Sequence, residues 1–203
     1  MISLLLASDF DAVFHKPSVQ ALLQGRRRVA FVPTASLHKD YASYIDSTLR
    51  PMFQSLALGV DVVELSRYSP SELRVALAPC DIVYVGGGNS FVLLQHMKEC
   101  GFKQAVTDML DAGGLYIGSS AGSVVASPDI GFISPMDDPA KAQLTDHQGL
   151  GLIDRAFIPH KGNAKHGDTA QMIEQSLHQQ NRPAFALRDD QALHIVEHES
   201  QIL

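Results

Sequence analysis

Short apolar runs alternate along the chain with longer segments in which apolar residues recur at helical spacing. The runs are rich in Val, Ile and Leu and show no polar face, which is typical of strands covered on both sides by helices. This pattern predicts strands over residues 2–6, 29–32, 60–65, 82–85, 115–117, 153–158, 184–187 and 193–196. Helical spacing predicts helices over residues 41–58, 70–78, 91–100, 103–112 and 168–177.

The residues between these segments support the same division. Residues 69–72 read Ser-Pro-Ser-Glu, a capping residue followed by Pro at the first helical position and Glu at the third. Gly59, Gly101 and Gly113 each follow a predicted helix, where a left-handed residue is favoured. Pro51 predicts a kink or break in the first long helix. Repeated strand–helix alternation predicts an α/β fold, a three-layer sandwich around a mostly parallel sheet.

Composition narrows the class of protein. The chain has 203 residues, 45% of them hydrophobic, and a net charge of −6, so we expect a single domain spanning residues 1–203. The basic run at residues 26–28 is too short for a phosphate-binding face, which argues against a nucleic-acid partner. No stretch approaches the ~20 apolar residues of a membrane span, and the apolar start is too short for a signal peptide. We therefore expect a cytoplasmic protein with no membrane partner.

Cysteine and histidine spacing gives no metal or cofactor signal. The two cysteines, Cys80 and Cys100, do not form a CxxC pair, and we expect both to be reduced thiols. The sequence has no HExxH motif, no Cys/His cluster at zinc spacing and no Walker-type Lys after its glycine-rich loop. We therefore expect no metal and no organic cofactor.

Three segments whose residues can bind a ligand or take part in catalysis fall at the carboxyl ends of predicted strands. They are the Gly-Gly-Gly-Asn loop at residues 86–89, the Gly-Ser-Ser-Ala-Gly turn at residues 118–122, and His160 with its neighbours. Ligands of open α/β sheets bind at this edge. The sequence therefore predicts one functional site that combines these segments.

The turn at residues 118–122 fits G-x-S-x-G, directly after a predicted strand. In this motif a strained strand-to-helix corner projects the central serine, and the flanking glycines allow strand and helix to approach closely. The following amides can stabilise an oxyanion. We predict Ser120 as the nucleophile, with Ser119 as its off-centre rival.

A serine needs a base to take its proton, and nine histidines are available. His160 ends a late predicted strand, which we expect beside the strand of the nucleophile, so it is the preferred base. His15, His38, His147 and His166 lie in predicted loops and are candidates to line the site.

The acid that orients the imidazole should follow another strand. Asp189 and Asp190 follow Arg188 after the predicted strand at residues 184–187, and the sequence leaves both open. The order Ser, His, Asp along the chain differs from the nucleophile–acid–base order of ordinary α/β-hydrolases, which argues against that fold.

Together, the segments YVGGGNSF at residues 84–91 and YIGSSAG at residues 116–122 resemble the peptidase E family of serine peptidases, relatives of cyanophycinase. The resemblance runs from about residue 2 to residue 196 and implies a fold like class I glutamine amidotransferases. It implies Ser120 as nucleophile and His160, followed three residues later by Asn163, as base. It also implies an oxyanion hole formed by the amides of Gly88 and Ala121.

The acid of that family is usually Glu in an L-P-E-like segment, and the corresponding stretch here ends at Asp189. The resemblance therefore implies Asp189 as the acid. Asp190, Asp137 and Asp138 remain its rivals.

One position departs from the family pattern. The family's aspartyl dipeptidases carry an arginine after a G-E-T-like segment, which selects an N-terminal aspartate in the substrate. Here Gly-Asp-Thr at residues 167–169 is followed by Ala170, so strict Asp-X specificity is not expected. Lys161, Lys165 and Arg188 are candidates to replace that arginine. Cyanophycinase activity is disfavoured, because its relatives tend to carry Asp-Gln where this chain has Gly-Asn.

The sequence thus predicts a serine peptidase that hydrolyses dipeptides or short peptides through an acyl-enzyme. We expect Asn89, Asn163 and Lys161 to contact the peptide substrate. The alternatives are an esterase or amidase on the same scaffold, or a catalytically silent binding domain of the glutamine amidotransferase type. A homodimer is compatible with the sequence, which shows no interface signature.

Overall fold

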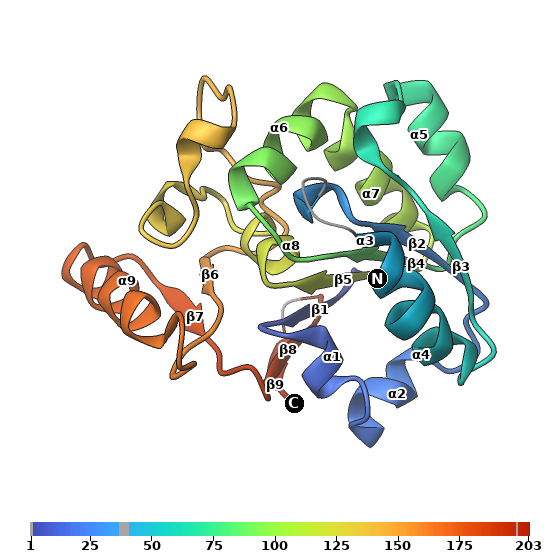
Figure 1. Ribbon diagram of the computed structural model, residues 1–203, viewed down its shortest axis with the longest axis horizontal. Coiled ribbons are helices and arrows are strands. Elements are labelled where there is room, and N and C mark those ends of the chain that lie inside the picture. The colour runs from blue at the N-terminus through green and yellow to red at the C-terminus, as the bar shows by residue number, and fades with distance from the viewer. Residues whose placement is uncertain (1, 37–40, 198) are drawn as a thin grey trace.

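A seven-stranded sheet forms the centre of the protein in a computed structural model, which describes residues 2–36, 41–197 and 199–203 (Figure 1). Its strand order is β3-β2-β4-β5-β1-β8-β9. The strands are β1 (Ser3–Ala7), β2 (Arg28–Val32), β3 (Gly59–Val62), β4 (Ile82–Val85), β5 (Leu115–Ser119), β8 (Ala192–Val196) and β9 (Glu199–Ile202). Strands β1 to β5 are mutually parallel, whereas β8 runs antiparallel to both β1 and β9.

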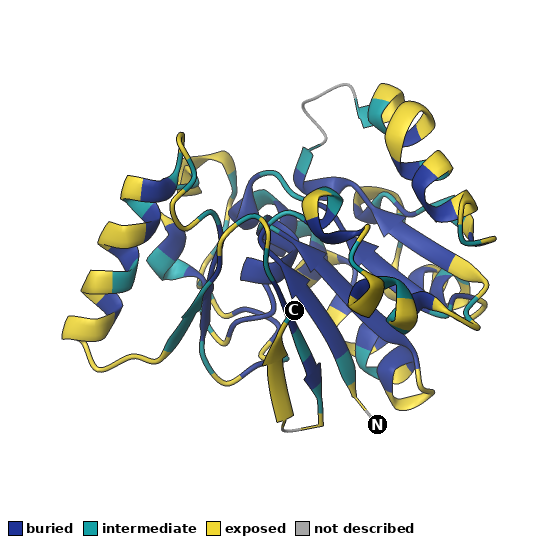
Figure 2. Cartoon of the chain, turned by 90° about the horizontal axis from the view of Figure 1, so that it is seen from below, coloured by how far each residue is buried: buried dark blue, intermediate teal, exposed yellow. Residues whose placement is uncertain are grey.

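Helices cover both faces of this sheet (Figure 1). The helices are α1 (Phe10–Val13), α2 (Pro17–Leu23), α3 (Tyr41–Tyr44), α4 (Arg50–Gln54), α5 (Pro70–Leu77), α6 (Ser90–Glu99), α7 (Phe102–Asp111), α8 (Ala121–Val124) and α9 (Gly167–Gln179). Alternate residues of β1 serve the two faces: Leu5 packs in one core with α1, α2 and α4, and Leu4 packs in the other with α5 to α8. Figure 2 shows the central strands buried between these layers. The predicted α/β sandwich with a mostly parallel sheet is confirmed.

A second, two-stranded parallel sheet stands beside the first. It pairs β6 (Ala156–Ile158) with β7 (Ala184–Ala186), and α9 packs against it. The expectation that His160 follows a strand beside the nucleophile's strand is therefore wrong. Strand β5 is already paired with β4 on one side and β1 on the other, so it has no free edge for β6.

Other differences lie where local geometry overrides the apolar pattern. The strand predicted over residues 60–65 ends at Val62, because Leu65 starts a 3₁₀ turn, Leu65–Arg67, and its amide donates to Thr34 Oγ1 at 3.0 Å. In the helix predicted over residues 41–58, a π-helical turn at Ile45–Leu49 joins α3 to α4, and the helix ends at Gln54. This turn precedes Pro51, where a kink or break was expected.

Several elements have no counterpart in the sequence prediction. Helices α1, α2 and α8 are short, and β9 is polar and exposed, so none carries a long periodic pattern. Within the described ranges, no helix is long and apolar enough to cross a membrane. Burial raises the pKa of the Cys80 and Cys100 thiols to about 11, so both stay protonated at neutral pH.

Candidate active site

Ser120 occupies the corner between β5 and α8 with a strained backbone, at φ 50° and ψ −111°. Positive φ at a non-glycine residue costs roughly 1–3 kcal/mol and must be held by surrounding bonds. The Ser120 amide donates to Ala7 O at 3.1 Å, and its carbonyl accepts from Ser123 N and Val124 N, each at 2.9 Å. Hydrogen bonds to β1 and to the first turn of α8 therefore hold the serine in this strained conformation at the strand-to-helix corner.

The two motif glycines are required by close backbone approach. A Cβ on Gly118 would lie 2.7 Å from the Gly122 carbonyl carbon, and one on Gly122 would lie 2.1 Å from Val85 O. Both distances are far below a van der Waals contact. The G-x-S-x-G pattern therefore reflects packing of α8 onto β4 and β5, as its sequence interpretation required.

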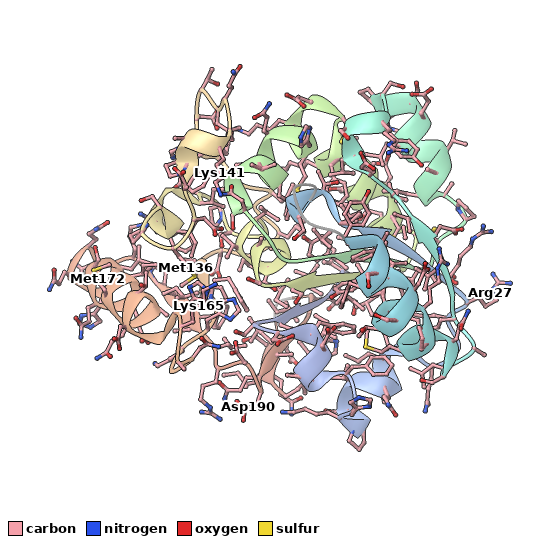
Figure 3. All side chains as sticks on the ribbon, in the orientation of Figure 1. Arg27, Met136, Lys141, Lys165, Met172 and Asp190 are labelled. Atoms are coloured by element: carbon pink, nitrogen blue, oxygen red, sulfur yellow. The ribbon has the colours of Figure 1, made fainter. Side chains whose placement is uncertain are left out.

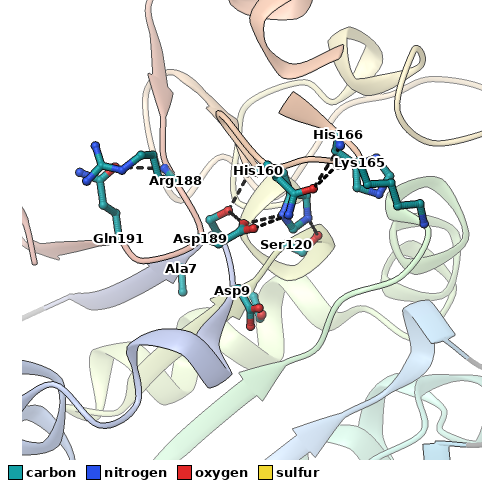
Figure 4. Close-up of polar contacts among 12 residues, drawn as sticks. Ala7, Asp9, Ser120, His160, Lys165, His166, Arg188, Asp189 and Gln191 are labelled. Atoms are coloured by element: carbon teal, nitrogen blue, oxygen red, sulfur yellow. Dashed lines mark hydrogen bonds and ion pairs between the residues drawn. The ribbon is translucent and has the colours of Figure 1, made fainter. Parts of the chain in front are cut away.

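Ser120, His160 and Asp189 form a continuous hydrogen-bonded chain (Figure 4). Ser120 Oγ lies 2.9 Å from His160 Nε2, and His160 Nδ1 lies 2.7 Å from Asp189 Oδ1. His160 follows β6 and has a φ of 66°, a second strained residue, and Asp189 follows β7. The small sheet thus presents both the imidazole and the carboxylate to a serine presented by the large sheet.

Further donors hold the Asp189 carboxylate. Ser8 Oγ donates to Oδ1 at 2.7 Å, and Asn163 Nδ2 donates to Oδ2 at 2.6 Å. Burial alone would raise the pKa of Asp189, but the hydrogen bonds from Asn163, His160 and Ser8 outweigh it and lower the pKa below its ordinary value. Asp189 is therefore ionised at neutral pH and able to orient the imidazole and stabilise its protonated form.

Ser8 was missed by sequence reasoning. Besides donating to Asp189, its Oγ accepts from the His160 amide at 2.7 Å, so one buried hydroxyl joins the end of β1 to both loops of the small sheet. The available signal was a polar residue two positions after the first predicted strand, at the carboxyl edge where site residues gather.

The rivals of Ser120 and Asp189 have other partners. Ser119 Oγ accepts from the Phe10 amide at 3.1 Å. Asp190 pairs with Arg188 at 3.0 Å. Asp137 Oδ2 accepts two hydrogen bonds from Ser90 at the start of α6, and Asp138 accepts from Ala140 N at 3.0 Å. Asp189 alone of these four aspartates has a hydrogen bond to His160 within the described residues.

The glycine-rich loop lies against Ser120 and leaves an amide available. A Cβ on Gly87 would be 3.3 Å from Ser120 Cβ, and Gly88, at φ 144°, has no room for a side chain against Ala35 O. Ser36 Oγ donates to Gly87 O at 2.6 Å. Because a trans peptide points its N–H opposite to its C=O, the Gly88 amide faces away from Ser36.

The amides of Gly88 and Ala121 were predicted to form the oxyanion hole. Throughout the described ranges, neither amide has a hydrogen-bond partner. Two unpaired donors close to a nucleophile are the groups that can bind a developing negative charge.

The side chains predicted to contact substrate already hold internal bonds. Asn89 Oδ1 caps α6, and its Nδ2 donates to Asp138 O at 3.0 Å. Asn163 binds Asp189 through its nitrogen, and its oxygen accepts from the Lys165 amide at 2.7 Å. Lys161 Nζ pairs with Glu174 of α9 at 2.8 Å. These contacts favour structural and positioning roles for all three.

Of the histidines considered as site-lining residues, His166 lies beside His160. Its ring centroid is 5.4 Å from that of His160. Burial, followed by the electrostatic effect of the nearby His160 and Lys165 side chains, lowers the pKa of His166. His147 instead packs on Phe91, the exposed ring of His15 lies against Phe14, and His38 lies outside the described residues.

The basic run is remote from this site, and the described residues include no metal-binding cluster. The basic run at residues 26–28 lies at the start of β2, and Figure 3 shows Arg27 across the molecule from Lys165. In the described part of the chain, no group of three or more His, Cys, Asp or Glu side chains could hold a metal ion.

A serine on a strand-to-helix turn, bonded to an imidazole that a carboxylate orients, is the arrangement of serine hydrolases that form acyl-enzymes. Comparison with known proteins narrows this class. The family model described as Peptidase family S51 matches residues 4–203. The chain belongs to peptidase family S51, and it is a hydrolase of the peptidase E type.

Relatives and solved structures agree with this assignment. An uncharacterised peptidase of Listeria monocytogenes serovar 1/2a is 37% identical over 175 residues, covering 85% of this chain and 84% of that protein. Peptidase E of Shigella flexneri serotype 5b is 34% identical over 151 residues, covering 73% of this chain and 61% of that protein. A crystal structure of a peptidase E candidate from Listeria monocytogenes EGD-e superposes with a TM-score of 0.88 at 32% identity, covering 100% of this chain and 98% of that one.

Proposed function

We propose that this chain hydrolyses dipeptides or other short peptides through an acyl-enzyme on Ser120. The observation that carries the proposal is the hydrogen-bonded chain from Ser120 Oγ through His160 to Asp189, with distances of 2.9 and 2.7 Å. Membership of a peptidase family supports peptides as substrates. The unpaired Gly88 and Ala121 amides supply the oxyanion hole that such chemistry needs.

In the first half-reaction, Ser120 Oγ attacks the scissile carbonyl carbon while His160 Nε2 takes the hydroxyl proton. The carbonyl oxygen becomes an oxyanion bound by the amides of Gly88 and Ala121. Asp189 keeps the proton of Nδ1 in place and stabilises the imidazolium. The C–N bond then breaks, and His160 gives its Nε2 proton to the leaving amine, which leaves an ester on Ser120.

In the second half-reaction, water replaces the departed amine. His160 Nε2 takes a proton from the water as its oxygen attacks the ester carbonyl, and the same two amides bind the oxyanion. Collapse of this intermediate breaks the bond to Ser120 Oγ, which regains its proton from His160. The products are the free acid and the resting enzyme.

Substrate selection differs from that of an aspartyl dipeptidase in this proposal. Ala170, at the position of the missing arginine, is 1% exposed in the core, so it offers no charge to a substrate. Two of the candidate replacements have carboxylate partners, Lys161 with Glu174 and Arg188 with Asp190. The third candidate, Lys165, is an exposed point charge that cannot form a bidentate pair, so a substrate carboxylate lacks the partner that strict Asp-X selection requires.

The test is a dipeptide panel that varies the N-terminal residue, assayed with wild type, Ser120→Ala and Ser119→Ala. We expect cleavage by wild type, a loss of at least about 10⁴-fold in kcat for Ser120→Ala, and retained cleavage for Ser119→Ala. A parallel set of esters separates a peptidase from an esterase. Absence of peptide and ester cleavage, with no labelling of Ser120 by an acylating reagent, would replace this proposal with the binding-domain alternative.

A further inference from the structure

A cavity of about 250 Å³ opens beside the Ser120 turn. Its walls come from the ends of β1, β2, β4 and β5 and from α1 and α3, all at the carboxyl edge of the sheet. Gly87 and Ser119 line it; a side chain on Gly87 would reach Ser120 Cβ, and Ser119 precedes Ser120 in the chain. A group in this cavity would therefore lie next to the acyl group of a bound substrate.

Two carboxylates line this cavity, those of Asp9 and Asp11. In Figure 4, Asp9 lies near Ser120, and Ser120 lies between Asp9 and His166. Asp9 Oδ1 accepts the Asp11 amide at 3.1 Å, and Asp11 Oδ1 accepts the Tyr44 hydroxyl at 2.8 Å. Within the described residues, neither carboxylate has an ion pair with a cation.

The surroundings of these carboxylates favour an incoming positive charge. Burial raises the pKa of Asp11, the Tyr44 hydrogen bond opposes this, and the negative charge of Asp9 raises the pKa further. A cation between the two carboxylates would relieve this repulsion. The cavity is also lined by the aromatic rings of Phe31, Tyr44 and Tyr84, whose π faces attract cations.

We propose that this cavity is a substrate subsite for a cationic amine, and this inference rests on the proposed peptidase function. The amine is the α-ammonium of the substrate's N-terminal residue or the side-chain cation of Lys or Arg. At about 250 Å³ the cavity falls below the ~300–1,000 Å³ of sites for drug-sized ligands, so it fits one such group and not a whole peptide. An anionic side chain would meet two carboxylates there.

The first test measures binding, so that it does not depend on turnover. Wild type, Asp9→Asn/Asp11→Asn and the control Asp111→Asn are titrated calorimetrically with lysinamide, norleucinamide and N-acetylnorleucinamide. Asparagine keeps both hydrogen bonds as acceptor, and Asp111 is an exposed residue of α7 whose loss changes net charge alone. We expect lysinamide to bind wild type and Asp111→Asn, and to bind the double variant about 10- to 100-fold more weakly.

The three compounds distinguish the source of the cation. Equal binding of lysinamide and norleucinamide, lost on acetylation, identifies the α-ammonium, and a preference for lysinamide identifies the side chain. Equal binding of all three compounds, or no loss in the double variant, would overturn the inference.

A second readout separates this inference from the proposed function. Labelling of Ser120 by an uncharged sulfonyl fluoride should be the same in wild type and in the double variant, while kcat/KM for lysine p-nitroanilide falls about 10- to 100-fold. Labelling without any preference for cationic substrates would refute the subsite and leave the peptidase proposal standing. Failure to label wild-type Ser120 at all would refute the peptidase proposal itself.

Discussion

Two carboxylate sites lie beside the Ser120 turn, and they differ in the hydrogen-bond donors around them. Asp189 accepts hydrogen bonds from three side chains, those of Ser8, His160 and Asn163. Asp11 accepts one from a side chain, the hydroxyl of Tyr44. Burial opposes ionisation at both sites, yet the pKa of Asp189 is lowered whereas that of Asp11 is raised.

This difference suits the two carboxylates to different roles. A carboxylate surrounded by donors keeps a fixed charge and a fixed position, which suits a group that orients an imidazole. A carboxylate with few donors keeps unused acceptor capacity, which suits a group that binds an incoming cation. Neutral variants at each position can test the distinction.

The largest expected effect comes from removing the charge at the donor-rich site. Asp189→Asn should lower kcat by about 10⁴-fold, because an amide favours the wrong tautomer of His160 and does not stabilise the imidazolium. Steady-state kinetics on the best substrate of the dipeptide panel measures this loss. Asp190→Asn is the matched control, since Asp190 is the adjacent residue and pairs with Arg188. Equal losses in the two variants would contradict the assignment of Asp189.

A smaller effect on kcat is expected from removing one of the hydrogen-bond donors to Asp189, which leaves its carboxylate with fewer donors, as at Asp11. Ser8→Ala removes one of the three donors and should lower kcat by about 10- to 100-fold with KM unchanged, as expected for a hydrogen bond to a charged group. The control is Ser123→Ala: both serines are fully buried, but Ser123 Oγ donates to Ala7 O and touches neither Asp189 nor His160. A kcat loss of the same size in Ser123→Ala would reduce Ser8 to a structural role.

The parts of the site that sequence reasoning predicted depend on local geometry. The Ser120 turn is specified by glycines two residues away on each side, whose close contacts fix the strand-to-helix corner. The central sheet follows from apolar runs that are buried on both faces. These features are encoded within a few residues, so they can be predicted without knowing how distant segments pack.

The parts that were missed depend on contacts between distant segments. Ser8 meets Asp189 across 181 positions, and no local pattern marks that pair. The residues alone left Asp189 and Asp190 open, and only the family resemblance selected Asp189, the aspartate that contacts His160. The carboxylate cavity joins α1 to Tyr44 of α3, and α1 itself was too short to predict.

The smallest effect is on stability, where the two carboxylates should respond to pH with opposite sign. The folded-state pKa of Asp189 lies below its unfolded value near 3.8, so its ionised form stabilises the protein above that pH, and this contribution is lost as pH falls through the folded pKa. The folded-state pKa of Asp11 is raised, so its contribution is present below pH 3.8 and lost as pH rises through the folded pKa.

Thermal unfolding of wild type, Asp189→Asn and Asp11→Asn between pH 3 and 7 tests this. At pH 7, Asp189→Asn should have a lower Tm than wild type and Asp11→Asn a higher one. The Asp11→Asn difference should shrink as pH falls toward 3.8, and the Asp189→Asn difference should shrink as pH falls below 3.8. The expected differences are a few degrees, since 1 kcal/mol shifts the Tm of a chain of this size by about 2–4 °C. A lower Tm for both variants at pH 7 would mean that Asp11 is already satisfied within the fold, and the contrast between the two sites would be lost.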